Sequence, residues 1–142
     1  MTEEARKPLL VRAQDGRAYE MGRMRAVFKA DQAETAGRYS ISEWWLEPRT
    51  RGPGVHAHGE DHVYFVIEGS LGLFLDGRWS DLDKGGYVVI PGGTPHDFRN
   101  SGEARAGFMS LNVPGGFEER MPDIASALSA EDLGMDPDSS PS

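Results

Sequence analysis

Glycine and proline interrupt this chain so often that they restrict it to short regular segments. The 142 residues include 18 glycines and 9 prolines, and most of these stand in clusters between runs rich in β-branched and aromatic residues. Glycine and proline favour turns over long helices, whereas β-branched and aromatic residues favour strands. The pattern predicts many short strands joined by tight turns, and therefore an all-β sandwich or barrel, with the jelly roll as the favoured architecture.

Residues 38–46 (RYSISEWWL) show the alternation expected of a strand. Successive side chains of a strand point to opposite faces, so Glu43 and Trp45 share one face while Trp44 lies on the other. Asp76-Gly77 is a strong hairpin signal between two further runs. The other expected strands occupy residues 24–29, 62–68, 71–75, 78–82, 87–90, 96–99 and 106–113.

The ends of the chain differ in composition from the middle. We expect an N-terminal arm over residues 1–20, a β-barrel over 21–116, a short helix over 117–128 and a disordered acidic tail over 129–142. The helix is expected because apolar residues there follow a helical period, although Pro122 favours a break or a later start.

Charge and cysteine content argue against several classes of function. A net charge of −8 disfavours binding to nucleic acid or to anionic membranes. The absence of cysteine removes disulfides, thiolate nucleophiles and iron–sulfur clusters. No apolar run approaches the roughly 18 residues of a membrane-spanning helix, and the N-terminus has no signal-peptide pattern. A cytoplasmic location is therefore expected.

All four histidines of the chain fall in two short stretches: His56, His58, His62 and His96. The first two share a face if the chain is extended there, and a turn can bring the third beside them. Three or four neutral imidazoles suit a borderline divalent metal such as Zn, Mn, Fe, Co, Ni or Cu. An isolated strand histidine is more often a surface residue or a hydrogen-bonded core residue, but four of four in one constellation favours a metal site.

Two motifs carry a resemblance to the cupin superfamily. Residues 55–69 (VHAHGEDHVYFVIEG) resemble the first cupin motif, which has HxH, three or four residues, Glu, six residues and Gly. Residues 85–100 (GGYVVIPGGTPHDFRN) match the second motif, G-x5-P-x-G-x2-H-x3-N. The resemblance implies a small single-domain cupin of the type-2 conserved-barrel kind. Its fold would be a double-stranded β-helix, or jelly-roll barrel, and such cupins commonly form homodimers.

One departure from the family pattern concerns the metal site. His62 stands where cupins usually have Glu, so the chain resembles the minority with four histidine ligands, His56, His58, His62 and His96. The resemblance implies one divalent transition metal (Mn, Fe, Zn, Ni or Cu). Reading Glu60 or Asp61 as the ligand would require the spacing to Gly69 to break. Thr50 also replaces an expected glycine, which affects only the loop before the motif.

The strand period suggests which residues surround the metal. Tyr64 shares a face with His62, and Phe98 shares one with His96. If the faces that carry Phe108, Glu43 and Trp45 also point inward, the pocket is aromatic and apolar, with Trp45, Phe98 and Phe108 as substrate-binding residues. Glu43 and Tyr64 are then the candidate catalytic groups for proton transfer. The alternatives are that the aromatic residues form the barrel core and that Glu43 is a solvated surface charge.

Three functions are consistent with these residues. The first is a metal-dependent oxidoreductase of dioxygenase type acting on a small aromatic or enolisable molecule. The second is a non-redox zinc enzyme, such as a polyketide-type cyclase, an isomerase or a lyase. The third is a cupin that binds a small molecule without catalysis. A homodimer is expected from the resemblance. Outward Val63, Phe65 and Ile67 would supply an apolar face either for that contact or for packing on the second sheet of the same chain.

Overall fold

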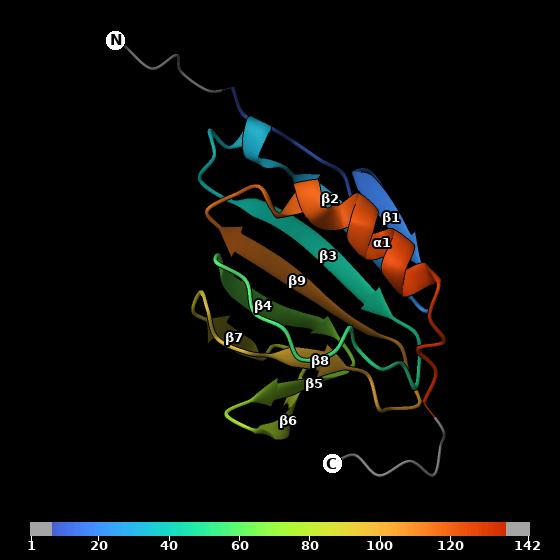
Figure 1. Ribbon diagram of the computed structural model, residues 1–142. Coiled ribbons are helices and arrows are strands. Elements are labelled where there is room, and N and C mark those ends of the chain that lie inside the picture. Colours follow the sequence, from blue (N-terminus) through green and yellow to red (C-terminus); the bar gives the residue numbers. More distant parts are fainter. Residues whose placement is uncertain (1–6, 136–142) are drawn as a thin grey trace.

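The computed structural model describes residues 7–135 and is built almost entirely from antiparallel strands (Figure 1). It confirms the all-β architecture with a short C-terminal helix. The strands are β1 (Arg17–Met21), β2 (Met24–Ala30), β3 (Ser40–Leu46), β4 (Asp61–Glu68), β5 (Ser70–Leu75), β6 (Arg78–Asp83), β7 (Tyr87–Ile90), β8 (Asp97–Arg99) and β9 (Ala106–Val113).

Two sheets form the two layers of the domain. The larger sheet has the strand order β1-β2-β3-β9-β4-β7, and the smaller has the order β6-β5-β8. Apolar side chains from both sheets join one core, in which Phe98 of β8 lies 5.2 Å from Phe108 of β9, measured between ring centroids. The pairing of β4 with β9 places His62 opposite Asn112 and Tyr64 opposite Ser110. This register positions the inner face that carries the site.

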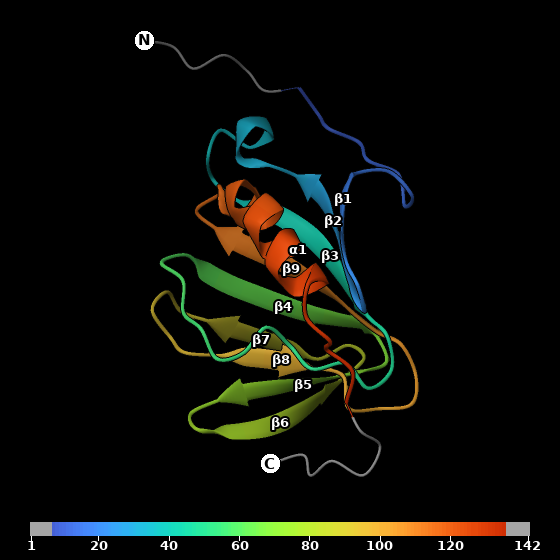
Figure 2. The ribbon, with the colours of Figure 1, turned by 45° about the vertical axis from the view of Figure 1, so that its right-hand side comes forward.

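The C-terminal helix packs across the larger sheet (Figure 2). A 3-10 turn, η2 (Phe117–Arg120), leads directly into α1 (Met121–Ser129). Pro122 lies in the first turn of α1, where its missing N–H has no intrahelical partner to lose. The α-helix therefore starts late, next to Pro122, as the sequence predicted. The residues before it, 117–120, adopt the tighter 3-10 form. Met121 and Leu128 are buried against the core.

The segment after the helix is ordered as far as the structure describes it, which corrects the disordered tail expected from residue 129. Leu133 is buried, Gly134 bridges to Thr50, and the Met135 N–H donates to the Arg49 carbonyl. Acidic composition indicated disorder, but one apolar anchor and backbone pairing hold this stretch. Residues 136–142 of the expected tail lie outside the described residues.

The expected N-terminal arm also needs correction. Strand β1 occupies residues 17–21 and pairs with β2, so the sheet begins before the predicted boundary at residue 21. Residues 1–6 lie outside the described residues. A short 3-10 turn, η1 (Gln32–Glu34), precedes β3. The described part of the chain contains no helix that is long and apolar enough to cross a bilayer.

Candidate metal centre

Three histidines meet at one end of the space between the sheets. His56 and His58 lie in the loop before β4, and His96 immediately precedes β8. His56 and His96 form an isolated antiparallel bridge, with backbone N–H to carbonyl distances of 3.0 and 2.9 Å. One ring nitrogen from each of His56, His58 and His96 lies within 4.8 Å of the others. Backbone pairing therefore joins the two sequence motifs into one cluster.

His62 lies beside this cluster on β4. Its ring centroid is 5.0 Å from that of His58 and 5.3 Å from that of His96, and the side chain is buried. It does not belong to the group of ligand atoms within 4.8 Å. The structure therefore brings three of the four predicted ligands together, and a fourth ligand at His62 stays a prediction.

Hydrogen bonds leave the right nitrogens available for a cation. The Nδ1–H groups of His56 and His96 donate to the carbonyls of Gly54 and Thr94, at 2.6 and 2.8 Å. A carbonyl only accepts, so Nε2 of each ring carries a lone pair. The Nε2 atoms of His62 and His96 are buried without a partner. Unpartnered buried imidazole nitrogens that converge with two further rings fit a divalent transition metal.

Burial keeps His58, His62 and His96 in the neutral form that binds metals. Desolvation, reinforced by the neighbouring imidazoles and by Arg120, lowers the pKa of His58 to about 4 and that of His62 to about 3. Burial also lowers the pKa of His96. A neutral imidazole has the free lone pair that a metal requires.

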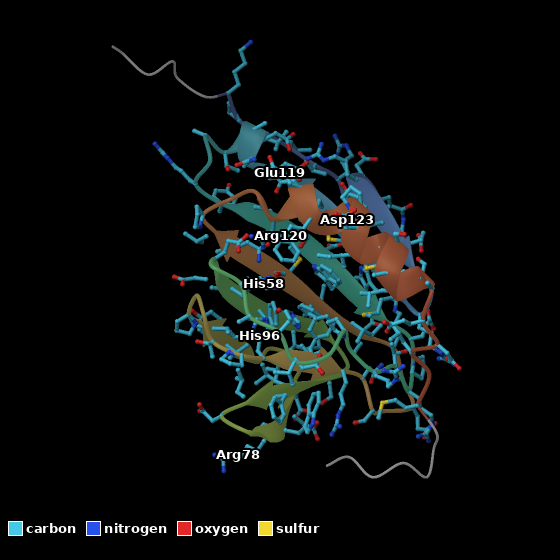
Figure 3. The ribbon with its side chains drawn as sticks, viewed as in Figure 1. His58, Arg78, His96, Glu119, Arg120 and Asp123 are labelled. Carbon is cyan, nitrogen blue, oxygen red and sulfur yellow. The ribbon has the colours of Figure 1, made fainter. Side chains whose placement is uncertain are left out.

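The two carboxylates between His58 and His62 are committed to other partners. The Arg120 Nη1 lies 3.0 Å from Oε1 and 2.9 Å from Oε2 of Glu60, while Asp61 is exposed and accepts the Gly92 N–H at 2.7 Å. The same Arg120 nitrogen is 3.5 Å from His58 Nδ1, so η2 meets the histidine loop here (Figure 3). These contacts favour imidazoles over Glu60 or Asp61 as ligands.

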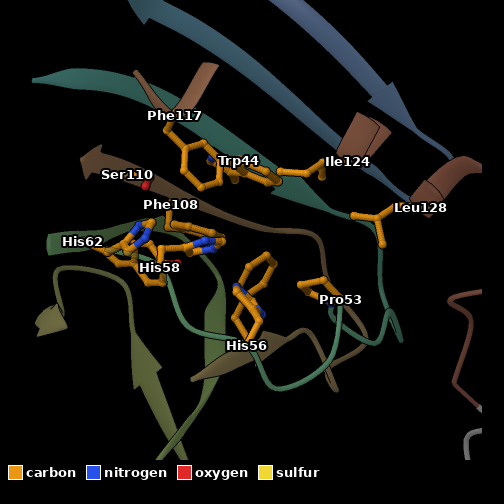
Figure 4. Close-up of a pocket in the computed structure, with 12 residues that line it drawn as sticks. Trp44, Pro53, His56, His58, His62, Phe108, Ser110, Phe117, Ile124 and Leu128 are labelled. Atoms are coloured by element: carbon orange, nitrogen blue, oxygen red, sulfur yellow. The ribbon is translucent and has the colours of Figure 1, made fainter. Parts of the chain in front are cut away.

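A largely apolar pocket of about 250 Å³ opens beside the histidines (Figure 4). It contains Tyr64, Phe98 and Phe108, as the strand period predicted. The full lining is Trp44, Pro53, His56, His58, His62, Tyr64, Phe98, Phe108, Ser110, Phe117, Ile124 and Leu128.

The structure corrects the expected positions of Glu43 and Trp45. Both lie on the outer face of β3, and Trp44 occupies the inner face. The Trp45 ring covers Gly107 and stacks with the Arg105 guanidinium 4.3 Å away. Glu43 is thus remote from the pocket and has no catalytic position there. Trp44 takes the place predicted for Trp45.

Tyr64, one of the two predicted catalytic groups, lines the pocket beside His62. Its ring centroid is 6.0 Å from that of His62, and burial raises the pKa of its phenol well above the usual value. Among residues 7–135, neither the Tyr64 hydroxyl nor the cross-strand Ser110 hydroxyl has a hydrogen-bond partner. Both hydroxyls are therefore free to contact a molecule in the pocket.

Sequence reasoning did not assign the residues that close the pocket on its helical side. Phe117, Ile124 and Leu128 extend from η2 and α1 into the lining (Figure 4). Their helical spacing predicted that one face of the helix is buried. No local feature of the sequence indicated that this face packs over the histidines. Asn112 and Arg120, which contact His62 and His58, were also missed because both contacts are distant in sequence.

Residues 42–112, half of the chain, match the family model Cupin_2, described as a cupin domain. A search of curated protein sequences gave no match. The polyketide cyclase RemF from Streptomyces resistomycificus is 26% identical, with 75% of this chain and 80% of that chain covered and a TM-score of 0.66.

Two more distant structures share the fold. KdgF from Halomonas sp. is 16% identical, with coverage of 80% and 99% and a TM-score of 0.69. A predicted oxalate decarboxylase from Thermotoga maritima is also 16% identical, with coverage of 75% and 99% and a TM-score of 0.67. At this identity the likeness concerns the architecture alone.

Proposed function

The chain belongs to the Cupin_2 family of cupin domains, and from this premise we propose that it is a metal-dependent enzyme for a small, uncharged, aromatic or enolisable substrate. One observation carries the proposal: an apolar, aromatic pocket opens directly beside the cluster of His56, His58 and His96.

The chemistry of the lining supports the substrate class. None of its twelve side chains is a carboxylate, guanidinium or ammonium group. A charged group that lies in the pocket away from the metal would lose its hydration without gaining a charged side-chain partner, which is costly. Arg120, the nearest cation among the described contacts of the cluster, is already paired with Glu60. Flat rings would instead pack against Trp44 and Phe108, which are themselves stacked with a centroid distance of 6.3 Å.

We propose that His56, His58 and His96 hold the metal, with His62 as a fourth ligand. When bound, such a metal supplies Lewis-acid polarisation of a carbonyl or enolate oxygen. The protein supplies the orientation of the substrate and a hydrogen-bond donor. Burial raises the pKa of the Tyr64 phenol, so Tyr64 stays protonated and can donate a hydrogen bond to a substrate oxygen, with Ser110 beside it.

Two reaction classes follow from this arrangement. Non-redox cyclisation or isomerisation is favoured by the likeness to a polyketide cyclase at 26% identity and by the free, protonated Tyr64. Oxidoreductase chemistry of dioxygenase type is the second candidate, because a histidine cluster also accommodates Fe, Mn, Cu or Ni. The metal identity separates the two: zinc supports the first and a redox-active ion the second.

A homodimer is part of the proposal. The outer face of β4 and β7 exposes Phe65, Tyr87 and Val89, which are 45%, 60% and 47% exposed. Phe65 lies opposite Tyr87 in the strand register, and Val63 lies opposite Val89, so these side chains form one apolar patch. A second copy that covers this patch would remove its apolar surface from water.

The first test is the metal content of untagged protein purified without chelator or added metal. One zinc per chain and oxygen-independent conversion of an enolisable polyphenol would support cyclisation or isomerisation. One Fe, Mn, Cu or Ni with oxygen uptake would support the oxidoreductase. Tight binding of the polyphenol without any conversion would identify a binding protein, and absence of metal would refute the proposed site.

Single alanine substitutions of the histidines test the ligands. Loss of metal in the His56, His58 and His96 variants is expected, and full occupancy in any two of the four variants would refute the site. His62→Glu should retain the metal, because a carboxylate is also a suitable ligand. Loss of binding in that variant would show that His62 does not occupy the position of the usual cupin glutamate.

A further inference from the structure

Asn112 is a buried amide that contacts His62 across the β4–β9 pair. Asn112 is 1% exposed on the inner face of β9, and its register partner on β4 is His62. Its amide nitrogen lies 2.6 Å from His62 Nδ1, and its Oδ1 is buried without a partner. No other histidine among the described residues has a side-chain amide at its Nδ1.

This partner differs in kind from those of the neighbouring histidines. His56 and His96 donate Nδ1–H to backbone carbonyls, which fixes the lone pair on Nε2. A primary amide has both a donor and an acceptor end, and a half-turn about χ2 exchanges them. The orientation of the Asn112 amide therefore decides which nitrogen of His62 carries the proton.

Two observations favour the oxygen end toward His62. If Nδ2 donates to Nδ1, the proton lies on Nε2, and that N–H is buried with no acceptor. If Oδ1 accepts from Nδ1–H, Nε2 carries a lone pair directed toward the cluster, where a metal would bind it. The 2.6 Å separation is also very short for two nitrogens, and it lies just below the range of about 2.7–3.2 Å for an N–H···O bond.

We infer that Asn112 is the positioning residue that makes His62 a metal ligand, by accepting the Nδ1–H through its Oδ1. This inference rests on the proposed metal site. It places a side-chain amide of β9 in control of the His62 tautomer, whereas the Nδ1 partners of His56 and His96 are backbone carbonyls. The orientation of Asn112 therefore decides whether His62 presents a lone pair to the metal.

The test compares Asn112→Leu with Asn112→Asp in the full chain. Leucine has a volume similar to that of asparagine but no hydrogen-bond acceptor. The carboxylate of aspartate can only accept a hydrogen bond, so it keeps the proton of His62 on Nδ1. Loss of such an outer partner typically weakens metal binding by about 10- to 100-fold. Zinc affinity, measured by competition with a chelating dye, should fall by this factor in Asn112→Leu and return to the wild-type value or tighter in Asn112→Asp.

A spectroscopic readout separates positioning from general stability. Long-range ¹H–¹⁵N NMR correlations show which nitrogen of His62 carries the proton. We expect Nδ1–H in wild type and in Asn112→Asp, with and without zinc, and a shift toward Nε2–H in zinc-free Asn112→Leu. Asn100→Leu is the matched control, because Asn100 is equally buried and donates to the carbonyls of Glu47 and Ala104. Its folded fraction should bind zinc as wild type does.

The outcomes distinguish this inference from the proposed function. Nε2–H on His62 of the zinc-loaded wild type, or unchanged zinc affinity in Asn112→Leu, would overturn the role of Asn112 while the metal site stands. If wild type binds no zinc, cobalt or iron, the proposed function fails. The tautomer of the metal-free protein then still decides whether Asn112 orients His62.

Discussion

Replacing Phe117 by alanine is expected to lower the free energy of unfolding by about 3 kcal/mol. Phe117 is 6% exposed and anchors the start of the C-terminal segment. Its ring stacks on Phe28 at 6.5 Å and meets the rings of His58 and His62 edge-on at 5.1 and 5.6 Å. The substitution therefore removes contacts to the sheet and to the histidines at once.

The magnitude follows from burial and from the pocket. Truncation of a core phenylalanine typically costs about 3–5 kcal/mol. One side of this ring already lines a pocket, so the cavity term is smaller and the low end of the range applies. For a chain of this length, about 3 kcal/mol corresponds to a decrease in Tm of roughly 10 °C.

Urea unfolding followed by tryptophan fluorescence and calorimetry would measure this effect. Amide exchange should also quicken in α1 before it does in β3 or β9, because α1 loses its anchor. Phe65→Ala is the matched control: its side chain is 45% exposed on the outer face, and a change below about 1 kcal/mol is expected in dilute solution. A loss below about 1 kcal/mol for Phe117→Ala itself would refute the idea that this ring fastens the segment over the site.

Four further predictions follow from the same structure. The metal-free protein should lose stability as the pH falls from about 6.5 toward 4, because His58 and His62 have lowered pKa values in the fold and bind protons more readily when it unfolds. Calorimetry between pH 7.5 and 5 measures this loss, and a melting temperature that does not change with pH would contradict it. Gly52→Ala should destabilise the fold by about 1–3 kcal/mol or more, since the added Cβ would lie 1.8 Å from the Phe98 carbonyl oxygen; chemical denaturation that gives the wild-type midpoint would count against the close approach. Zinc at 100 times its Kd should raise the free energy of unfolding by about 2.7 kcal/mol, and an unchanged Tm would argue against binding to the folded state. Phe65→Asp should convert the proposed dimer to a monomer of 15.6 kDa by light scattering, whereas a persistent dimer would exclude this patch as the interface.

The alternation in β3 predicted which residues share a face of the strand, but not which face is buried. The pattern identified two faces with one tryptophan each, but both faces carried apolar and polar residues in similar number. The inner face was decided by packing: Trp44 stacks on Phe108 inside, while Trp45 covers Gly107 outside. Periodicity defines which residues share a face, and only the second layer of structure defines which face is buried.

The same distinction applies to the carboxylates. Glu43 shares a strand with the pocket wall and was a plausible base, yet it lies on the outer face. Glu60 stands next to the histidines in sequence but is bound by Arg120, sixty residues later in the chain. An ion pair between such distant residues has no signature in local spacing.

The sequence by itself determined the strands from β2 to β9, the turns and the histidines that approach one another, because glycine, proline and β-branched residues act through local backbone preferences. Spacing also related the histidine motifs to the cupins before any contact was known. The tertiary structure alone decided that α1 closes the pocket, that Trp44 faces it and that Asn112 meets His62. Those features depend on how β4, β9 and the C-terminal helix pack together, and packing is a property of contacts between residues far apart in the chain.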